Sequence, residues 1–348
     1  MISADIRAAL ERQVVGQPRA VNTLVRSVTV GHSGLSSRET PVGMFLLLGP
    51  SGTGKTHIAS SLAGVLHGDR DRLAVVDCVQ LERPEHWSEL VRQLAPHFRY
   101  PVPGHGDGLR AMAPSSILLV EHIETARSEC VQALVAVLET GRVALEDGSV
   151  GSLRGCLVLM TSRLCAREIY GADRQEIGFT GAVGDLEETE RARIYNLCCN
   201  AVERSWGSDF LGHLDDLIIF HRLREPHLAL ILDRFLGEMN RHLAGRDVRV
   251  ELEPAARSFL LERSARFLRH GAWYLGKVFR RFVLFPMADL ASSDLLQPGS
   301  RVWARREGDL LSFSVSADPA TSCAGEPSPA PAIDIPIAWD DRGRATVG

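Results

Sequence analysis

The segment from Gly49 to Thr56 constrains this chain more than any other. It reads Gly-Pro-Ser-Gly-Thr-Gly-Lys-Thr, a glycine followed after four residues by Gly-Lys-Thr. The apolar run at 44–48 predicts a buried parallel strand before it, and the pattern at 57–66 predicts a helix after it. A glycine-rich turn between a strand and a helix lets backbone N–H groups surround phosphates, because no Cβ stands in the way. We therefore predict that this chain binds a nucleoside triphosphate.

Within this segment, two side chains have distinct predicted roles. Lys55 is expected to reach the β- and γ-phosphates, and the Thr56 hydroxyl is expected to bind Mg²⁺. The N-terminus of the following helix adds a partial positive charge. The predicted phosphate-binding residues are Gly49, Pro50, Ser51, Gly52, Thr53, Gly54, Lys55 and Thr56.

Composition narrows the class of protein. A length of 348 residues predicts two compact domains and a tail. The composition, with 45% hydrophobic and 24% charged residues, is typical of a soluble globular protein. The formal net charge of −4, without a basic stripe, disfavours nucleic acid as a partner. No apolar run approaches the roughly 20 residues that span a membrane. The N-terminus has an early acidic residue, Asp5, and no long hydrophobic region, which argues against a signal peptide.

The seven cysteines follow no metal-binding or disulfide pattern. None forms a C-x-x-C pair, and an odd number is typical of thiols in a reducing cytoplasm. We interpret them all as structural. They are Cys78, Cys130, Cys156, Cys165, Cys198, Cys199 and Cys323.

The first two thirds of the chain alternate short apolar runs with helical patterns. The further predicted strands are 73–77, 117–120, 157–160 and 217–220. A helical stretch at 130–140 ends at Gly141, where a C-terminal glycine cap belongs. This alternation predicts an α/β fold, a doubly wound parallel sheet over residues 1–222, with its ligand at the carboxyl ends of the strands.

At about Leu223 the alternation of apolar runs and helical patterns gives way to a series of helical patterns. Amphipathic helices are predicted at 225–242, 253–267 and 271–291, followed by a β-hairpin of 301–304 with 311–315. These elements predict a small helical domain over residues 223–316. Residues 317–348 are rich in Pro, Ala, Ser and Gly without periodicity, which predicts a disordered tail.

Several short motifs occur in one order. Val14-Val15-Gly16-Gln17, the phosphate-binding segment and Glu121–Ala126 follow the order of AAA+ ATPases. Further matching segments are 138–142, 147–148, 159–162, 210–215, 218–221, 271–272, 285–288 and 298–299. With these, residues 8–316 resemble the C-terminal ATPase module of the Clp unfoldases and disaggregases.

The resemblance carries several implications. It implies an AAA+ core followed by a helical lid domain, with ATP and Mg²⁺ as cofactors and with Val15 and Gly16 at the nucleotide. It also implies a homo- or hetero-oligomeric ring acting on polypeptide. About a dozen residues precede Val14, so we expect no substrate-recruiting N-terminal domain and no first ATPase ring, which favours a partner-dependent role.

The catalytic pair of the family is altered here. In the family the third strand ends in Asp-Glu, which serve the metal and the attacking water. The match at 123–126 aligns Glu121 with the Asp and His122 with the Glu. Glu121 keeps a carboxylate for Mg²⁺ beside Thr56, and a neutral imidazole can accept a proton. A second register stays open, in which Val120 and Glu121 take these positions and the metal ligand is lost.

Three more positions depart from the family. Arg163 stands where the family has an Asn that positions water, and an arginine cannot accept a hydrogen bond. His213 stands where a neighbouring subunit's arginine finger would be, a residue worth about 10³–10⁵ in rate. Trp273 replaces the lid arginine and cannot pair with a γ-phosphate.

Two segments resemble partner-binding elements. Tyr100, within 98–104, matches the pore-loop aromatic that grips polypeptide, but the flanking glycines are gone and two prolines stiffen the loop. A surface-packed aromatic is the alternative. Ile177-Gly178-Phe179 resembles the tripeptide by which protease-partnered Clp unfoldases dock on a peptidase ring; ordinary loop packing is the alternative.

Together these features favour a cytoplasmic ATP-binding Clp-type module that takes part in protein remodelling or assembly and has weak or absent hydrolysis. One alternative is an active ATP-dependent unfoldase whose site residues have drifted. A nucleic-acid-handling AAA+ protein is a third hypothesis, disfavoured by the acidic balance.

Overall fold

The structure is a computed structural model, and it divides the chain into two compact units, Met1–Arg222 and Leu223–Gly348. The described residues are 2–33, 41–70, 72–80, 116–140, 142–144, 150–153, 155–175, 188–265, 267, 271–293, 295–317, 333–335, 337–339 and 345–347.

The first unit is built on a parallel sheet. Its five strands are β1 (Gly43–Leu48), β2 (Ala74–Asp77), β3 (Ser116–Glu121), β6 (Cys156–Ser162) and β7 (Asp216–Ile219). The strand order is β2-β3-β6-β1-β7, and every neighbouring pair is parallel. The α/β doubly wound sheet predicted from the sequence is therefore confirmed, with strand ends shifted by one or two residues.

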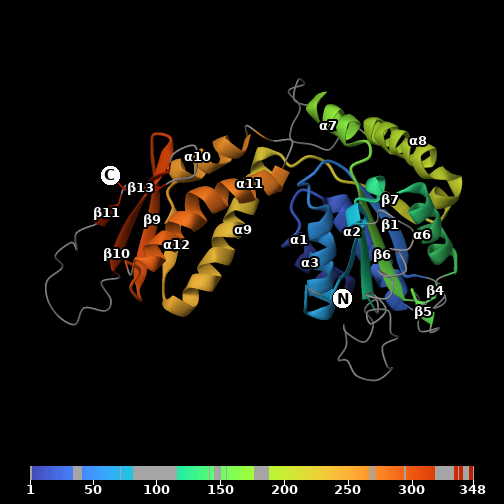
Figure 1. The fold of residues 1–348 in the computed structure, drawn as a ribbon, viewed down its shortest axis with the longest axis horizontal. Coiled ribbons are helices and arrows are strands. Elements are labelled where there is room, and N and C mark those ends of the chain that lie inside the picture. The colour runs from blue at the N-terminus through green and yellow to red at the C-terminus, as the bar shows by residue number, and fades with distance from the viewer. Residues whose placement is uncertain are drawn as a thin grey trace. The chain divides into compact units, whose positions relative to one another are not determined.

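Helices cover both faces of this sheet (Figure 1). On one face lie α1 (Ile2–Glu11), α2 (Pro18–Ser33) and α3 (Lys55–His67). On the other lie α6 (Ser128–Thr140), α7 (Ala166–Gln175) and α8 (Glu188–Gly212). Successive β1 residues alternate between the two cores: Leu46 and Leu48 enter one, Phe45 and Leu47 the other. Burial on both faces explains why β1 is apolar throughout.

The first unit has three local features that the sequence patterns did not predict. Helix α3 begins at Lys55, two residues before the predicted helix, because Gly54 adopts φ 104° and ends the turn there. Helix α8 contains a non-helical residue, Gly207 at φ 91°, which breaks it into two segments. A small antiparallel pair, β4 (Arg142–Ala144) with β5 (Val150–Ser152), was not predicted.

The second unit contains helices around its own apolar core. They are α9 (Glu225–Leu243), α10 (Pro254–Ala265), α11 (Gly271–Phe279) and α12 (Phe285–Ser292). A π-helical turn, Arg280–Leu284, joins α11 to α12. The helix predicted at 271–291 is therefore one helical stretch with a changed period in its middle. Leu232, Phe259 and Leu275 are among the fully buried residues.

A four-stranded sheet completes this unit, in the order β11-β10-β9-β8. Strands β9 (Ser300–Glu307) and β10 (Leu310–Ala317) form the predicted hairpin, turning at Gly308 with φ 60°. Strand β8 (Arg249–Leu252) pairs parallel with β9.

The predicted tail contains short strands. Strand β11 (Ile333–Ile335) pairs antiparallel with β10, and β12 (Ile337–Trp339) pairs with β13 (Ala345–Val347). This differs from the disorder expected for 317–348. A three-residue pattern such as Ile333-Asp334-Ile335 is too short to identify in a Pro-rich segment. Strand β11 gains its hydrogen bonds from β10, and β12 and β13 gain theirs from each other.

Two further observations concern the helices and the cysteines. No helix in the described ranges is both long and apolar enough to span a membrane. The six cysteines in these ranges are free thiols, of which Cys199 is half-buried and the others are buried.

Candidate nucleotide-binding site

The phosphate-binding segment forms a tight loop between β1 and α3. Gly49 and Gly54 adopt φ values of 150° and 104°, which residues with a side chain rarely adopt. A Cβ on Gly49 would also clash with the backbone carbonyl oxygen of Phe220, at the end of β7. Gly49 therefore meets two separate requirements, one for its dihedral angle and one for space.

Lys55 folds back onto this loop. Its Nζ donates hydrogen bonds to the carbonyl oxygens of Gly49, at 2.7 Å, and Pro50, at 2.8 Å. Burial lowers the Lys55 pKa to about 8, with Glu124 opposing this shift and Arg163 adding to it. The ammonium group is thus held in a poorly solvated site, where an anion would stabilise it.

This pKa predicts a pH-dependent affinity. An anionic ligand requires the ammonium form of Lys55, which dominates below pH 8 and is lost above it. The affinity for Mg·ATP should therefore fall about 10-fold between pH 7 and pH 9. Because the chain has only two lysines, Lys55 and Lys277, ¹³C-dimethyl-lysine NMR can follow Lys55 directly. Titration of both lysines near the ordinary value of 10.5 would contradict the prediction.

Thr56 and Glu121 come together at the carboxyl ends of the strands. The Thr56 hydroxyl donates a hydrogen bond to Oε1 of Glu121, the last residue of β3. A hydroxyl beside one carboxylate fits Mg²⁺, which is commonly bound by one or two carboxylates together with substrate phosphates. No group of three or more metal-ligating side chains occurs within the described ranges. The contact favours the register that aligns Glu121 with the metal ligand.

The imidazole of His122 lies toward β2, on the side of β3 away from β1, whereas its backbone N–H faces β6. His122 adopts φ 57°, and its N–H donates to Thr161 Oγ1 at 3.3 Å. Its Nδ1 lies 3.2 Å from Oδ1 of Asp77, the last residue of β2, and this oxygen also accepts the N–H of Val79. Since β3 lies between β2 and the rest of the sheet, the imidazole is engaged away from the strand that carries the loop.

Arg163 and Glu124 form an ion pair beside the loop. Arg163 Nε donates to Glu124 Oε1 at 2.9 Å. Burial opposes ionisation of Glu124, but hydrogen bonds, first that of Arg163, outweigh it and the Glu124 pKa is lowered. In the sequence analysis, Glu124 served only to align residues 123–126 with the family and was given no role in the site. Its short 3₁₀ turn, Ile123–Thr125, gives no periodicity that would show which way the side chain faces.

The segment that carries Val15 and Gly16 is tied to the loop through Gln17. Gln17 Nε2 donates to the carbonyl oxygens of Thr53, at 3.2 Å, and His221, at 2.8 Å. Its Oε1 accepts the His221 N–H at 3.2 Å. One buried side chain therefore joins the N-terminal segment, the phosphate-binding loop and the end of β7.

Other predicted residues lie elsewhere. His213 precedes β7, at the opposite end of the sheet from the loop that follows β1, and its Nδ1 contacts the Asp209 carbonyl oxygen. Trp273 is on α11 of the second unit, 55% exposed, with Lys277 Nζ 3.8 Å from its ring centroid. Tyr100 and Ile177-Gly178-Phe179 fall outside the described residues.

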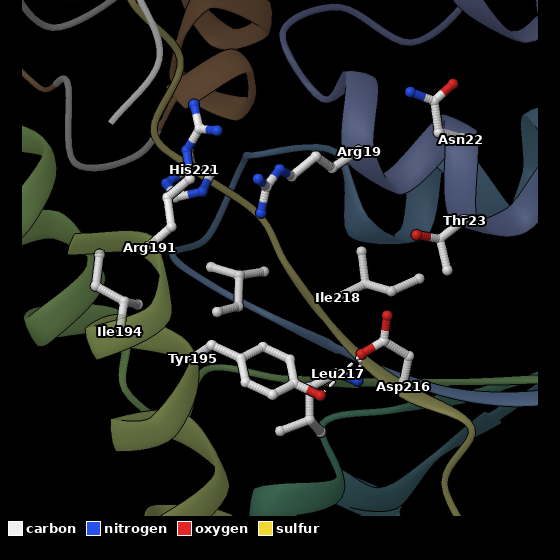
Figure 2. A pocket seen from close by; sticks show the side chains of 11 residues that line it. Arg19, Asn22, Thr23, Arg191, Ile194, Tyr195, Asp216, Leu217, Ile218 and His221 are labelled. Carbon is white, nitrogen blue, oxygen red and sulfur yellow. Dashed lines mark hydrogen bonds between the residues drawn. The ribbon is translucent and has the colours of Figure 1, made fainter. Parts of the chain in front are cut away.

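A pocket of about 300 Å³ follows the edge of β7 that pairs with no other strand among the described residues (Figure 2). Tyr195 of α8 donates to Asp216 Oδ1 at 2.9 Å, and the same oxygen accepts the Leu217 N–H. The residues that line the pocket are Arg19, Asn22, Thr23, Arg191, Ile194, Tyr195, Asp216, Leu217, Ile218, Ile219 and His221. None belongs to the predicted phosphate site, although His221 borders it through Gln17.

The sheet order, the glycine-rich loop and the Thr56–Glu121 contact define a P-loop nucleotide-binding core followed by a helical domain. The model of the AAA domain (Cdc48 subfamily) matches residues 40–217, about half of the chain. The C-terminal, D2-small domain of ClpB protein matches residues 223–304. The chain therefore belongs to the AAA+ ATPases and is a module of the Clp type, as its motifs predicted.

Its relatives include Clp chaperones. It is 28% identical over 308 residues to the chaperone protein ClpB of Rhizobium meliloti (strain 1021), covering 88% of this chain and 34% of that one. It is 27% identical over 289 residues to the negative regulator of genetic competence ClpC/MecB of Bacillus subtilis (strain 168), covering 83% and 34%. The chain thus spans about a third of the length of these relatives.

A solved structure has the same fold. The closed state of Hsp104 with ATPγS and FITC casein matches with a TM-score of 0.70 and 24% identity, covering 89% of this chain and 51% of that one. At this identity the match shows the fold alone.

Proposed function

We propose that this chain binds Mg·ATP as a Clp-type AAA+ module and acts mainly through binding, with slow or no hydrolysis, in protein remodelling or assembly. The observation that carries the proposal is that the phosphate-binding residues are intact while the residue aligned with the catalytic glutamate is engaged elsewhere. The loop keeps its glycines, Lys55 and the Thr56–Glu121 contact, whereas the adjacent His122 is bonded to Asp77.

Binding is supported by the geometry of the loop. Lys55 sits in a buried position where its charge lacks full solvation, and the backbone of the loop turns at three glycines with positive φ. Thr56 and Glu121 would hold Mg²⁺, which would neutralise charge on the phosphates when bound.

Slow hydrolysis is supported by the replaced groups. Phosphoanhydride hydrolysis needs an oriented water and a cation over the developing charge. His122, the residue aligned with the water-orienting glutamate, has one ring nitrogen beside Asp77. His213 and Trp273 stand where the family has arginines, so neither position supplies a guanidinium.

The partners of the chain are proposed from its relatives. The ClpB relative is named a chaperone protein, and the Hsp104 structure contains casein, a polypeptide. We therefore propose a ring, formed by this chain alone or with a related one, that engages polypeptide. Pore contact by Tyr100 and peptidase docking by Ile177-Gly178-Phe179 stay predictions.

The test compares nucleotide binding with phosphate release on the purified chain. We expect calorimetry to show Mg·ATP binding and phosphate release to stay near the background of a Lys55→Ala variant. Turnover well above that background and rising with unfolded protein would support an active unfoldase instead. Absence of binding would contradict the proposal altogether.

A gain-of-function variant tests the cause of slow hydrolysis. His122→Glu restores a carboxylate, but Asp77, 3.2 Å from the present ring, would repel it. We therefore expect the double variant Asp77→Asn, His122→Glu to raise phosphate release about 10-fold, below the roughly 10²–10⁴-fold that is typical of general-base effects, because other groups stay absent. The control Asp77→Asn, His122→Gln has the same size but no base. Equal rates in the two double variants would contradict this explanation.

A further inference from the structure

We propose that Cys165 and Cys198 form an oxidation site, at which a hydroperoxide converts the two thiols into a disulfide within the folded first unit. The bond would join the turn that follows β6 to helix α8. This inference goes beyond nucleotide binding and does not depend on it. It also revises the interpretation of these two cysteines as purely structural.

The fold brings the two cysteines together from separate elements. Cys165 lies between the end of β6 and the start of α7, and Cys198 lies within α8. Both are free thiols in one apolar core, and the Cys198 thiol donates a hydrogen bond to the sulfur of Cys165. Two sulfurs in such contact need only a small movement, on the order of 1–2 Å, to reach the roughly 2 Å of a disulfide bond.

The backbone holds Cys165 in an uncommon conformation. Its φ is 58°, in the left-handed region that residues other than glycine rarely adopt. Such strain persists only where the surrounding structure maintains it, and it often marks a functional position. The Cys165 carbonyl oxygen accepts the Ile169 N–H at 3.0 Å, so Cys165 stands at the N-terminus of α7. The positive end of the helix dipole favours a thiolate there.

The two thiols differ in acidity, which assigns them different roles. The hydrogen bond from Cys198 lowers the pKa of Cys165 and outweighs the opposing effect of burial. The same contact, together with burial, raises the pKa of Cys198. Because the thiolate is the nucleophile, Cys165 reacts first and Cys198 resolves the product. Cys165 is also 7% exposed whereas Cys198 is fully buried, so a small oxidant reaches the more reactive thiol first.

The reaction balances with a hydroperoxide as its one co-reactant. The Cys165 thiolate attacks the terminal oxygen: an S–O bond forms, the O–O bond breaks, and the leaving oxygen takes up the proton that Cys165 had lost. The sulfur of Cys198 then attacks the Cys165 sulfenic acid: the S–S bond forms, the S–O bond breaks, and water leaves with the Cys198 proton. Two thiols are oxidised by two electrons, and the hydroperoxide is reduced to water and water or an alcohol.

A second pair of cysteines in the same core provides an internal comparison. Cys78 interacts with Cys130, but burial raises the pKa of Cys78 to about 12. A thiol that is so weakly acidic contains almost no thiolate near neutral pH, and it is therefore inert toward hydroperoxides. We expect this pair to stay reduced under conditions that oxidise Cys165 and Cys198.

The test maps the thiols of the purified, reduced chain after treatment with hydrogen peroxide. The remaining thiols are blocked with iodoacetamide, and a tryptic digest is analysed by mass spectrometry without reductant. We expect a peptide that joins Cys165 to Cys198, lighter by two hydrogens than its two parts, formed about 10-fold faster than any oxidation of Cys78 or Cys130. Absence of this crosslink, or equal oxidation of all the buried thiols, would overturn the inference.

Variants distinguish Cys198 from its neighbour Cys199, which lies in the same tryptic peptide. Cys199→Ser should keep the crosslink. Cys198→Ser should lose it and leave a sulfenic acid on Cys165 that dimedone traps. Loss of the crosslink in Cys199→Ser, or an equally fast crosslink from Cys165 to Cys199 in Cys198→Ser, would show that the assigned pair is wrong.

Thermal unfolding tests whether the native fold accommodates the bond. A disulfide restricts the unfolded chain between the two residues, so the oxidised Cys199→Ser chain should unfold about 5–10 °C above its reduced form. Dithiothreitol should reverse this shift, and a Cys165→Ser chain should show no shift with peroxide. An oxidised midpoint at or below the reduced one would mean that the crosslink forms outside the native structure, contrary to the inference.

Discussion

Replacement of Lys55 by alanine is expected to weaken the binding of both ATP and ADP about 100-fold. A charge-assisted contact with phosphate contributes more than a neutral hydrogen bond, and Lys55 has more than one such contact to make. The same substitution should change the free energy of unfolding little, because burial already disfavours the ammonium and lowers its pKa to about 8. Calorimetry and thermal unfolding measure the two effects separately.

The chain provides a matched control for this substitution. Lys277, its one other lysine, lies over the Trp273 ring on α11, in the second unit. Lys277→Ala removes the same charge from the chain and should leave nucleotide affinity within about twofold. Equal losses from the two substitutions would mean that net charge, not the loop, governs binding, and would contradict the assigned role of Lys55.

Gly49→Ala is expected to destabilise the first unit by about 2–4 kcal/mol and to abolish measurable nucleotide binding. The φ of 150° is strained for alanine, and the added methyl group would clash with the Phe220 backbone carbonyl. That carbonyl is not free to move, because the Phe220 N–H is bonded to the Leu48 carbonyl oxygen at 2.7 Å. Denaturant unfolding followed with and without Mg·ATP measures both effects.

Gly171→Ala is the matched control. Gly171 lies within helix α7, and a Cβ there meets nothing within 4 Å. Alanine in a helix interior should be neutral or stabilising by up to about 1 kcal/mol. A Gly49→Ala variant that is as stable as Gly171→Ala and still binds nucleotide would show that the loop can rearrange, contrary to the prediction.

The parts of the fold that the sequence predicted are those with strong local signals. The five strands of the sheet read as short apolar runs because helices bury both of its faces. The helices at 225–242 and 253–267 show clear periodicity, and they occur as α9 and α10. The π-helical turn at Arg280–Leu284 was missed because it changes the helical period without a proline or glycine to mark it.

In the candidate site, the sequence predicted the conformation of the loop, because the motif specifies its own backbone geometry. Gly49 to Thr56 specify a turn and a helix start within eight residues, so the chain alone determines the phosphate-binding loop. The alignment of Glu121 could not be chosen from the sequence, since two registers of the same short strand were possible. The Thr56–Glu121 hydrogen bond favours one of them, and it joins residues 65 positions apart.

The sequence by itself therefore determined an α/β core with a glycine-rich loop, a helical second unit and the positions that depart from the family. Only the tertiary structure decided what those altered positions contact: His122 meets Asp77 from β2, and Arg163 meets Glu124 beside the loop. The physical reason is that side-chain pairing across a parallel sheet depends on strand order and register. Strand order and register are set by the packing of the whole core, and no periodic pattern in the sequence reveals them.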